Sequence, residues 1–246
     1  LMIIFFFLFV AIFADVLAPK SFRQQTLVDN NVAPQWIINL FPTMTSRETG
    51  GYVKVSETYI LGADSLGRDL LSRIIYGSRI SLLVAFIGPI VAMLVGVTLG
   101  LISGYFGGTV DNVIMRITDI MYAFPTLLLI ILLMSFFRPS SGQLEPGTVA
   151  YRLNQLDAST GGMLFIFVGI GLTSWMQMAR LTRGQVLSVR ENEYVLAALS
   201  IGTPTLSIMT RHILPNILGP LIVAETLMIP RYISYEAFLS FIGLGV

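Results

Sequence analysis

The sequence predicts an all-α membrane protein, and its composition and patterning support this prediction. Of the 246 residues, 54% are apolar and only 12% are charged, about half the charged content of a typical soluble domain. Long apolar stretches recur along the chain, each near the ~20 residues that a helix needs to cross a bilayer. A disordered chain and an ordinary soluble domain are therefore excluded. The net charge of +1 gives no electrostatic reason to expect nucleic-acid binding.

Five apolar stretches are the predicted membrane spans. The first, residues 1–18, carries Asp15 as its single charge and begins inside an apolar run, so we expect the N-terminal end of this span to be missing. A signal peptide is the alternative, but the basic region that such a peptide requires is not visible. The other four predicted spans are Ile80–Gly104, Ile120–Phe137, Gly161–Ala179 and Ile213–Val246.

Polar segments separate these spans and divide the chain into three parts. We expect a first span at 1–18, a loop with an amphipathic surface helix at 19–79, and a helical core at 80–246 with a polar loop at 180–215. The positive-inside rule favours a cytoplasmic position for this polar loop, because it contains Arg180, Arg183, Arg190 and Arg211. Residues 19–79 hold seven Lys and Arg, but this segment is close to the ~60-residue limit of the rule.

The motifs of several common catalytic sites are absent from the sequence. A Walker A loop ends in Gly-Lys followed by Ser or Thr, whereas the only lysines, Lys20 and Lys54, follow Pro and Val. With no cysteine and a single histidine, His212, the chain offers no thiolate or polyhistidine metal site and little scope for Ser-His catalysis. We therefore predict a non-enzymatic membrane role, with no catalytic residue, metal site or cofactor in this chain.

Small residues recur at every fourth position of the second predicted span. On a helix they form a ridge that allows another helix backbone to approach closely. The partner helix could belong to the same chain or to another subunit, and the spacing leaves both open. The ridge consists of Gly88, Ala92, Gly96, Gly100 and Gly104.

The segment before the second span reads as an amphipathic helix. Asp64 or Ser65 can cap its N-terminus by accepting backbone N–H bonds. Its apolar face would lie on the membrane surface, where it has either a structural role or a contact with an external partner. The residues of this face are Leu70, Leu71, Ile74 and Ile75.

Residues 193–216 carry helix start and stop signals in order. Glu193–Leu199 is a good helix, and Gly202 suits the left-handed position after a helix C-terminus. Thr203 is predicted to cap a second helix, with Pro204 at its first position. Met209, Ile213 and Leu214 supply an apolar edge, but this helix–turn–helix is too small to bury a core of its own. Since Ala197 and Ala198 make its surface shallow, we expect it to dock onto a partner.

The sequence at these positions resembles the inner-membrane subunits of ABC importers. Ala197-Ala198, Gly202 and Leu214-Pro215 match their EAA loop, although Leu196 stands where the motif usually has Glu. Further matches resemble the dipeptide, oligopeptide and nickel permease subfamily, and within it the C-type permeases of dipeptide importers. These matches are Leu61–Leu82, Gly104–Gly108, Asp111, Arg116, Asp119, Pro125, His212–Asn216 and Leu239–Gly245.

This resemblance implies a type I ABC importer permease core, with five of an expected six spans visible. It also implies that the loop at 180–215 is cytoplasmic and inserts into a groove on one of two ATPase subunits, which bind ATP and magnesium. A second homologous permease, a substrate-binding protein outside the membrane, and a bacterial or archaeal plasma membrane complete the expected surroundings. The coupling residues implied are Glu193, Ala197, Ala198, Gly202, Thr203, Pro204, His212 and Pro215.

Two charges in the last predicted span suggest a translocation pathway. Glu225 and Arg231 are costly at membrane depth and usually face a cavity or a partner. We hypothesise that they border the passage and contact a charged peptide terminus. Pairing with the partner permease is the alternative, and Arg231 could simply extend toward the membrane surface.

A secondary transporter is the competing functional class. It would couple transport to protons through Glu225 or Asp119, would need no ATPase, and should show an inverted repeat, which the sequence does not display. The sequence does not decide the cargo of an importer among dipeptides, longer peptides, nickel complexes and sugars.

Overall fold

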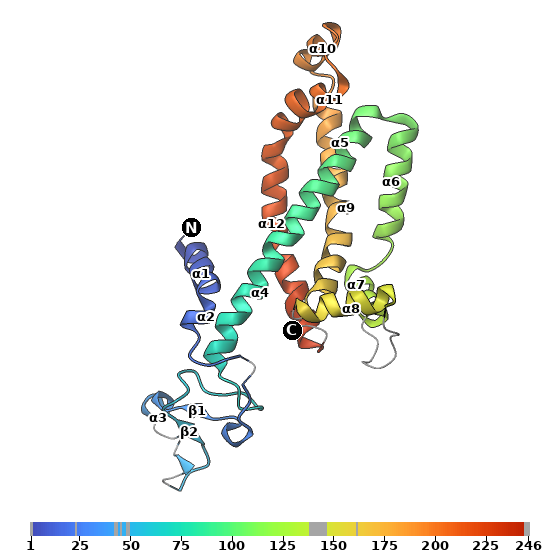
Figure 1. Cartoon of the computed structure of the whole chain (residues 1–246). Helices are drawn as coiled ribbons and strands as arrows, with labels where there is room; N and C mark the ends of the chain where they lie inside the picture. The colour runs from blue at the N-terminus through green and yellow to red at the C-terminus, as the bar shows by residue number, and fades with distance from the viewer. Residues whose placement is uncertain are drawn as a thin grey trace. The chain divides into compact units, whose positions relative to one another are not determined.

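The computed structural model describes residues 2–22, 24–41, 44, 46–47, 50–137, 147–160 and 162–243 (Figure 1). Residues 138–146, which belong to the polar segment between the third and fourth predicted spans, lie outside the described residues, as do positions 244–246 of the C-terminal motif. The chain divides into two compact units, Leu1–Leu83 and Val84–Val246. Each unit is described by itself.

The first unit combines short helices with a small two-stranded sheet. Its core contains Val32, Tyr59 and Ala63. The strands β1 and β2 pair in parallel, with Ala33 opposite Val55. Its elements are α1 (Met2–Ile12), α2 (Ala14–Leu17), η1 (Leu27–Asp29), β1 (Ala33–Pro34), α3 (Trp36–Leu40), β2 (Val55–Ser56) and the start of α4 (Leu70–Val91).

Asp15, the single charge of the first predicted span, is paired within this unit. Its carboxylate accepts hydrogen bonds from the Tyr76 hydroxyl at 2.9 Å and from Arg79 Nη2 at 3.1 Å. Arg79 Nε also donates to the carbonyl of Ala11 at 2.9 Å. An acidic side chain in an apolar segment is thereby compensated by the start of α4.

The predicted amphipathic surface helix is not a separate element, and this prediction is corrected. Residues from Leu70 onward form the first turns of α4, which continues to Val91. Gly77 does not interrupt the helix, because a lone glycine lowers helix stability by only about 1 kcal/mol. The N-terminus is capped by Asp69 rather than by Asp64 or Ser65, since Asp69 Oδ2 accepts from the Ser72 N–H at 2.8 Å.

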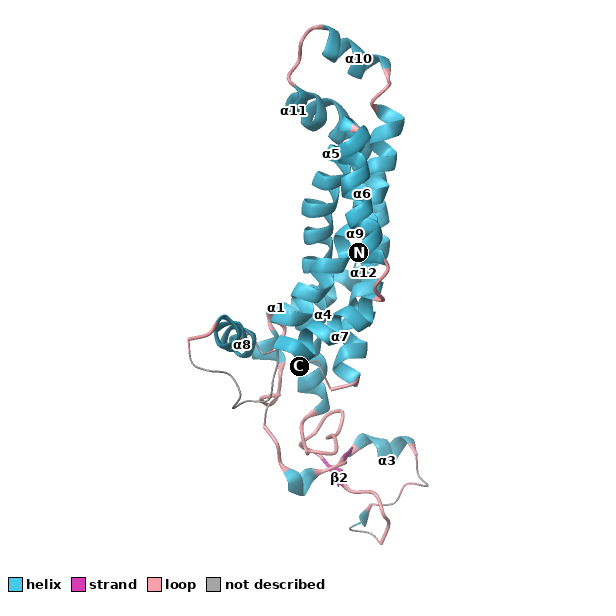
Figure 2. Cartoon of the chain, turned by 90° about the vertical axis from the view of Figure 1, so that its right-hand side faces the viewer, coloured by secondary structure: helices cyan, strands magenta, loops and turns pink. Residues whose placement is uncertain are grey.

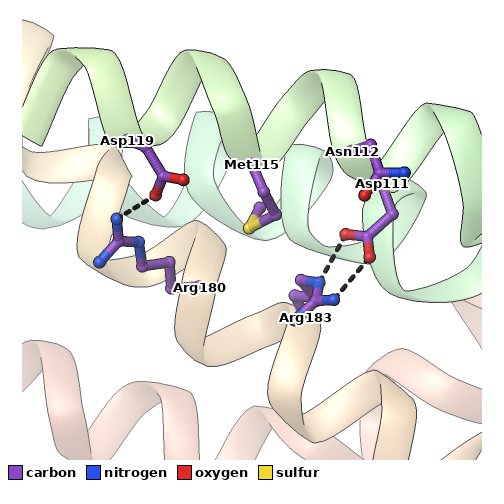
Figure 3. A pocket seen from close by; sticks show the side chains of 6 residues that line it. All are labelled: Asp111, Asn112, Met115, Asp119, Arg180 and Arg183. Carbon is purple, nitrogen blue, oxygen red and sulfur yellow. Dashed lines mark hydrogen bonds and ion pairs between the residues drawn. The ribbon is translucent and has the colours of Figure 1, made fainter.

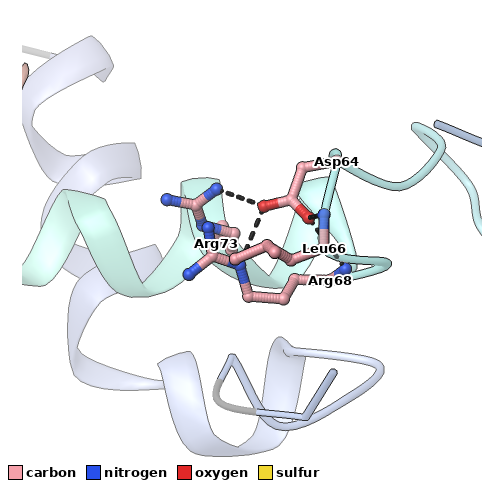
Figure 4. A network of polar contacts seen from close by, with 4 residues as sticks. All are labelled: Asp64, Leu66, Arg68 and Arg73. Atoms are coloured by element: carbon pink, nitrogen blue, oxygen red, sulfur yellow. Dashed lines mark hydrogen bonds and ion pairs between the residues drawn. The ribbon is translucent and has the colours of Figure 1, made fainter. Parts of the chain in front are cut away.

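Asp64 instead organises the turn that precedes α4 (Figure 4). Its Oδ1 accepts from the backbone N–H groups of Leu66 and Arg68 at 2.9 and 3.0 Å. Its Oδ2 accepts from Arg68 Nε at 2.8 Å and Arg73 Nη1 at 2.6 Å. Burial raises the pKa of this carboxyl, but the hydrogen bonds from Arg68 and Leu66 and the Arg68 charge outweigh it, so the pKa lies below its ordinary value.

The second unit is a helical bundle whose two ends differ. Helices α10 and α11 lie at one end and α8 lies at the opposite end (Figures 1 and 2). Its elements after the end of α4 are η3 (Ala92–Gly96), α5 (Val97–Phe106), α6 (Gly108–Tyr122), α7 (Thr126–Phe137), α8 (Val149–Ser159), α9 (Leu164–Val189), α10 (Glu193–Ser200), α11 (Thr205–Ser207), η4 (Ile208–Ile213) and α12 (Leu214–Phe241).

The described residues contain three continuous helices long and apolar enough to cross a membrane: Leu70–Phe106, Leu164–Val189 and Thr205–Phe241. A fourth span arises if Gly108–Tyr122 and Thr126–Phe136, bent by 78°, are counted as one. The predicted span Ile120–Phe137 is therefore long enough to cross a membrane only when α7 is counted together with α6. Residues 2–12 form an 11-residue apolar helix, and a complete span at 1–18 stays a prediction.

The predicted ridge of small residues packs inside the bundle. The Cα atoms of Gly96, Gly100 and Gly104 lie so close to α9 that an added Cβ would fall 2.5–2.7 Å from its nearest atom. Gly88 meets the Tyr232 ring of α12 in the same way, and Ala92 is fully buried. Of the two alternatives left open by the spacing, the structure shows packing within the chain.

Candidate functional site

Helix α10 ends with two backbone hydrogen bonds that reverse the chain at Gly202. The Gly202 N–H donates to the Leu199 carbonyl at 3.0 Å, and the Thr203 N–H donates to the Ala198 carbonyl at 3.1 Å. This pair of bonds is a Schellman motif, which requires a left-handed residue. Gly202 has φ +78°, as the sequence predicted.

The second helix begins later than predicted, and Thr203 does not cap it. Helix α11 starts at Thr205, with Pro204 as the flanking residue and no capping bond from a side chain. Pro204 has ψ 141°, which is extended rather than helical. Because a proline also holds the preceding residue extended, Thr203 lies one residue too far from the first free N–H groups to cap them.

Of the two alanines of the motif, one is buried and the other exposed, so the prediction of a shallow alanine surface is only half right. Ala198 is 5% exposed and packs with Val195 into the bundle core, whereas Ala197 is exposed. Met209 and Ile213, predicted as an apolar edge, are buried in the same core cluster. The turned segment is therefore anchored in the bundle through its inner face.

The outer face of this segment is apolar and exposed. The exposed side chains, which we call the α10 face, are Tyr194, Leu196, Leu199, Ile201 and Leu206. Ile201 is 84% exposed and Leu206 is 71% exposed. Sequence reasoning missed this face, although apolar residues around the Gly202 turn were a visible signal. Clustered apolar side chains of this kind usually mark an interaction surface.

The remaining predicted coupling residues surround this segment. Glu193 is exposed in the first turn of α10, and Pro215 is exposed in the first turn of α12. His212 is half-buried in η4, and its carbonyl accepts from Asn216 Nδ2 at 2.6 Å.

Behind the segment, an ion pair joins α9 to α6 (Figure 3). Arg183 binds both oxygens of Asp111, with each N–O distance 2.5 Å, the bidentate geometry that gives the strongest pairs. The Ser103 hydroxyl also donates to Asp111, and Arg190 Nη1 donates to the Gly104 carbonyl at 3.0 Å. The end of α9 that leads into α10 is thus tied to the α5–α6 turn.

A second ion pair joins the same helices, eight residues later on α6 and three residues earlier on α9. Arg180 Nη2 lies 2.5 Å from Asp119 Oδ1, and its guanidinium stacks 4.2 Å above the Tyr122 ring centroid. Both ion pairs border an open cavity of about 320 Å³ (Figure 3). Its lining residues are Asp111, Asn112, Met115, Asp119, Arg180 and Arg183.

The structure separates the two charges predicted to border a passage. Glu225 is 5% exposed, and its Oε1 accepts from the Tyr232 hydroxyl at 2.8 Å. Arg231 is exposed, and its Nε donates to the Tyr235 hydroxyl at 2.6 Å. Glu225 therefore faces the interior of the bundle, whereas Arg231 lies at its surface.

These features define a multi-pass membrane protein with an exposed apolar face on an anchored segment at one end of its bundle. Residues 96–246 match the family described as the binding-protein-dependent transport system inner membrane component, and the chain belongs to this family. The family description and the apolar helices agree in placing the chain in the inner membrane.

Relatives of this family extend the similarity to the first unit. The chain is 35% identical over 246 residues to the dipeptide transport system permease protein DppC of Bacillus subtilis (strain 168). It is 43% identical over 187 residues to the oligopeptide transport system permease protein OppC of Escherichia coli (strain K12), an alignment covering 76% of the chain. The alignments span 63% and 55% of these two relatives' own lengths.

Proposed function

We propose that this chain is a permease subunit of an ATP-driven importer and forms half of a translocation pathway for peptides. The observation that carries this proposal is the α10 face, which is apolar and exposed while the other side of α10 is fixed in the bundle core. Membership in a binding-protein-dependent transport family supports it. The relatives named above are permeases of dipeptide and oligopeptide systems, which supports peptides as the cargo.

The proposal assigns no bond-breaking chemistry to this chain. ATP and magnesium bind to two ATPase subunits, and one of them receives the α10 face in a groove. Movement of the ATPase then displaces α10 as a lever, because Val195 and Ala198 are packed against the core. The ion pair between Arg183 and Asp111 carries this displacement from α9 to α6. Rigid helices that shift together are a common way to transmit such a change.

The remaining partners follow from the same proposal. A second homologous permease completes the pathway, and a substrate-binding protein delivers peptide from outside. The loop at 180–215 is then cytoplasmic, while 19–79 and 138–160 face outward. The opposite positions of α10 and α8 in the second unit agree with this orientation (Figures 1 and 2).

Site-directed cross-linking tests the contact with the ATPase. The 246 residues contain no cysteine, so Ile201→Cys introduces a single thiol on the α10 face. Val149→Cys is the matched control, because this residue is 74% exposed on α8 at the opposite end. We expect Ile201→Cys, but not Val149→Cys, to cross-link to an ATPase subunit in the assembled complex. The absence of any cross-link from Ile201→Cys to a nucleotide-hydrolysing protein would refute the proposal.

A transport assay separates the proposal from the ion-coupled alternative. Vesicles that hold the complete complex should accumulate peptide only with ATP and the binding protein. Vesicles that hold this subunit alone should accumulate none, with or without a proton gradient. Accumulation by the lone subunit would contradict the proposal.

A further inference from the structure

A polar track follows one side of the helical bundle in the second unit. On α9, Thr173, Gln177 and Arg180 follow at intervals of four and three residues, which places them on one helix face. They face polar side chains of α6 and α7 across two cavities, one of about 320 Å³ and one of about 50 Å³. Tyr122 lines the smaller cavity and stacks on Arg180 of the larger one, so the two cavities adjoin.

Such a track is costly in a membrane-spanning bundle unless it faces water or another protein. Intramembrane charges nearly always face a water-filled cavity, a bundle interior or a partner. The larger cavity has its arginines neutralised, because Arg183 pairs with Asp111 and Arg180 pairs with Asp119. The smaller cavity has a different charge balance.

Arg231 lies on the smaller cavity and forms no ion pair with any carboxylate among the described residues. Its Nε donates to the Tyr235 hydroxyl at 2.6 Å, and its guanidinium carbon lies 5.5 Å from the centroid of the Tyr235 ring. A guanidinium has five N–H donors in a planar fork, and a single hydroxyl uses one of them. The others remain available to a planar anion.

Three more polar side chains line the same cavity as Arg231. They are Tyr122, Thr126 and Gln177, and among the described residues none of their side chains forms a hydrogen bond. Each can donate one bond to a carboxylate oxygen. A cavity of about 50 Å³ accepts a group of a carboxylate's size but not a whole peptide, since one water needs about 10–15 Å³ of such volume.

We propose that Arg231 binds the terminal carboxylate of the transported peptide as the peptide passes along this track. The bidentate fit between guanidinium and carboxylate makes the contact specific. Glu225 is no part of this site, because it is buried and bonded to Tyr232. This inference rests on the proposed function, since it presumes that a peptide crosses the membrane beside this chain.

The experiment uses the complete complex in vesicles with two forms of one peptide, the free acid and the C-terminal amide. A peptide is chosen whose two forms both bind the binding protein, and uptake is measured with that protein saturated by each form. The variants are Arg231→Gln and Arg231→Lys. Arg152→Gln is the matched control, because Arg152 is an exposed arginine on α8.

We expect Arg231→Gln to lower uptake of the free acid about tenfold, the scale of a lost charge-assisted bond, and to leave uptake of the amide near its wild-type rate. Arg231→Lys should give an intermediate preference for the acid, because Lys keeps the charge but loses the planar fork. Arg152→Gln should keep the wild-type preference.

An equal fall in uptake of both peptides in Arg231→Gln would overturn the inference. If Arg231→Gln does not assemble, an unchanged preference in Arg231→Lys would overturn it as well, and would indicate that Arg231 instead pairs with a neighbouring subunit. Failure of the wild-type complex to take up either peptide with ATP would reject the proposed function itself. The two failures are therefore distinguishable.

Discussion

Gly100 is the position where one added methyl group tests the packing of α5 against α9. In Gly100→Ala, the new Cβ would lie 2.5 Å from Thr182 Cβ and 2.6 Å from the Ala179 carbonyl oxygen. Optimal contacts between carbon atoms are about 3.5–4.0 Å, so the two helices must separate by about 1 Å. The Ala179 oxygen belongs to the α9 backbone and cannot rotate away. Overpacking of this kind costs about 1–3 kcal/mol, against a gain of up to about 1 kcal/mol from alanine in a helix.

We therefore expect Gly100→Ala to lower stability by about 1–2 kcal/mol, seen as a lower midpoint of thermal unfolding of the purified complex in detergent. Gly184→Ala is the control, because it lies in α9 with nothing within 4 Å of its added Cβ. The free energy of unfolding of this control should equal that of wild type or exceed it by up to about 1 kcal/mol. Equal midpoints for Gly100→Ala and Gly184→Ala would refute the reasoning from close helix contact.

Three further predictions concern the turn at α10, the ion pair behind it and the first unit. Gly202→Ala should lower the free energy of unfolding by about 1–2 kcal/mol, because an alanine at φ +78° is strained. It should also weaken peptide-stimulated ATP hydrolysis. Gly219→Ala, with open space around the added Cβ, should do neither. Asp111→Asn should leave Arg183 without its bidentate partner and lower the peptide uptake per ATP hydrolysed. The exchange of the two residues, Asp111→Arg with Arg183→Asp, should restore part of this uptake. No recovery in the exchanged pair would contradict a role for the ion pair. The folded-state pKa of Asp64 lies below its ordinary value, so its carboxylate stabilises the fold fully above the unfolded-state pKa of about 3.9, and this stabilisation is lost as the pH falls through the folded-state pKa. Asp64→Asn should therefore flatten the acid side of a curve of stability against pH, measured by circular dichroism. An unchanged acid side would count against the stabilising role of Asp64 in this turn.

Much of the fold follows from local properties of the chain that need no tertiary information. Hydropathy located the long helices, because a chain that crosses a bilayer of fixed thickness needs about 20 apolar residues and must form its backbone hydrogen bonds internally, as a helix does. Gly202 was predicted in the left-handed region and is found there at φ +78°, since only local sterics decide that position. The ridge from Gly88 to Gly104 was predicted to allow close helix contact and does so.

Predictions failed where two local signals competed or where a face had to be chosen. The surface helix was predicted as an element before the second span, yet Leu70–Val91 is one continuous helix. Thr203 was a good capping residue by type, but Pro204 keeps the chain extended for one residue more. Ala197 and Ala198 looked alike in sequence, and only the packing of α10 buries one of them.

The sequence by itself determined that this protein is a helical membrane protein, where its long apolar helices fall and where α10 must turn. These properties depend on transfer of side chains into lipid and on backbone sterics within a few residues. Only the tertiary structure decided which helix meets the glycine ridge, that Arg183 pairs with Asp111 across 72 residues of chain, and that Glu225 is buried while Arg231 is exposed. These contacts join segments far apart in sequence, and their partners are selected by the packing of whole helices rather than by any local preference of the chain.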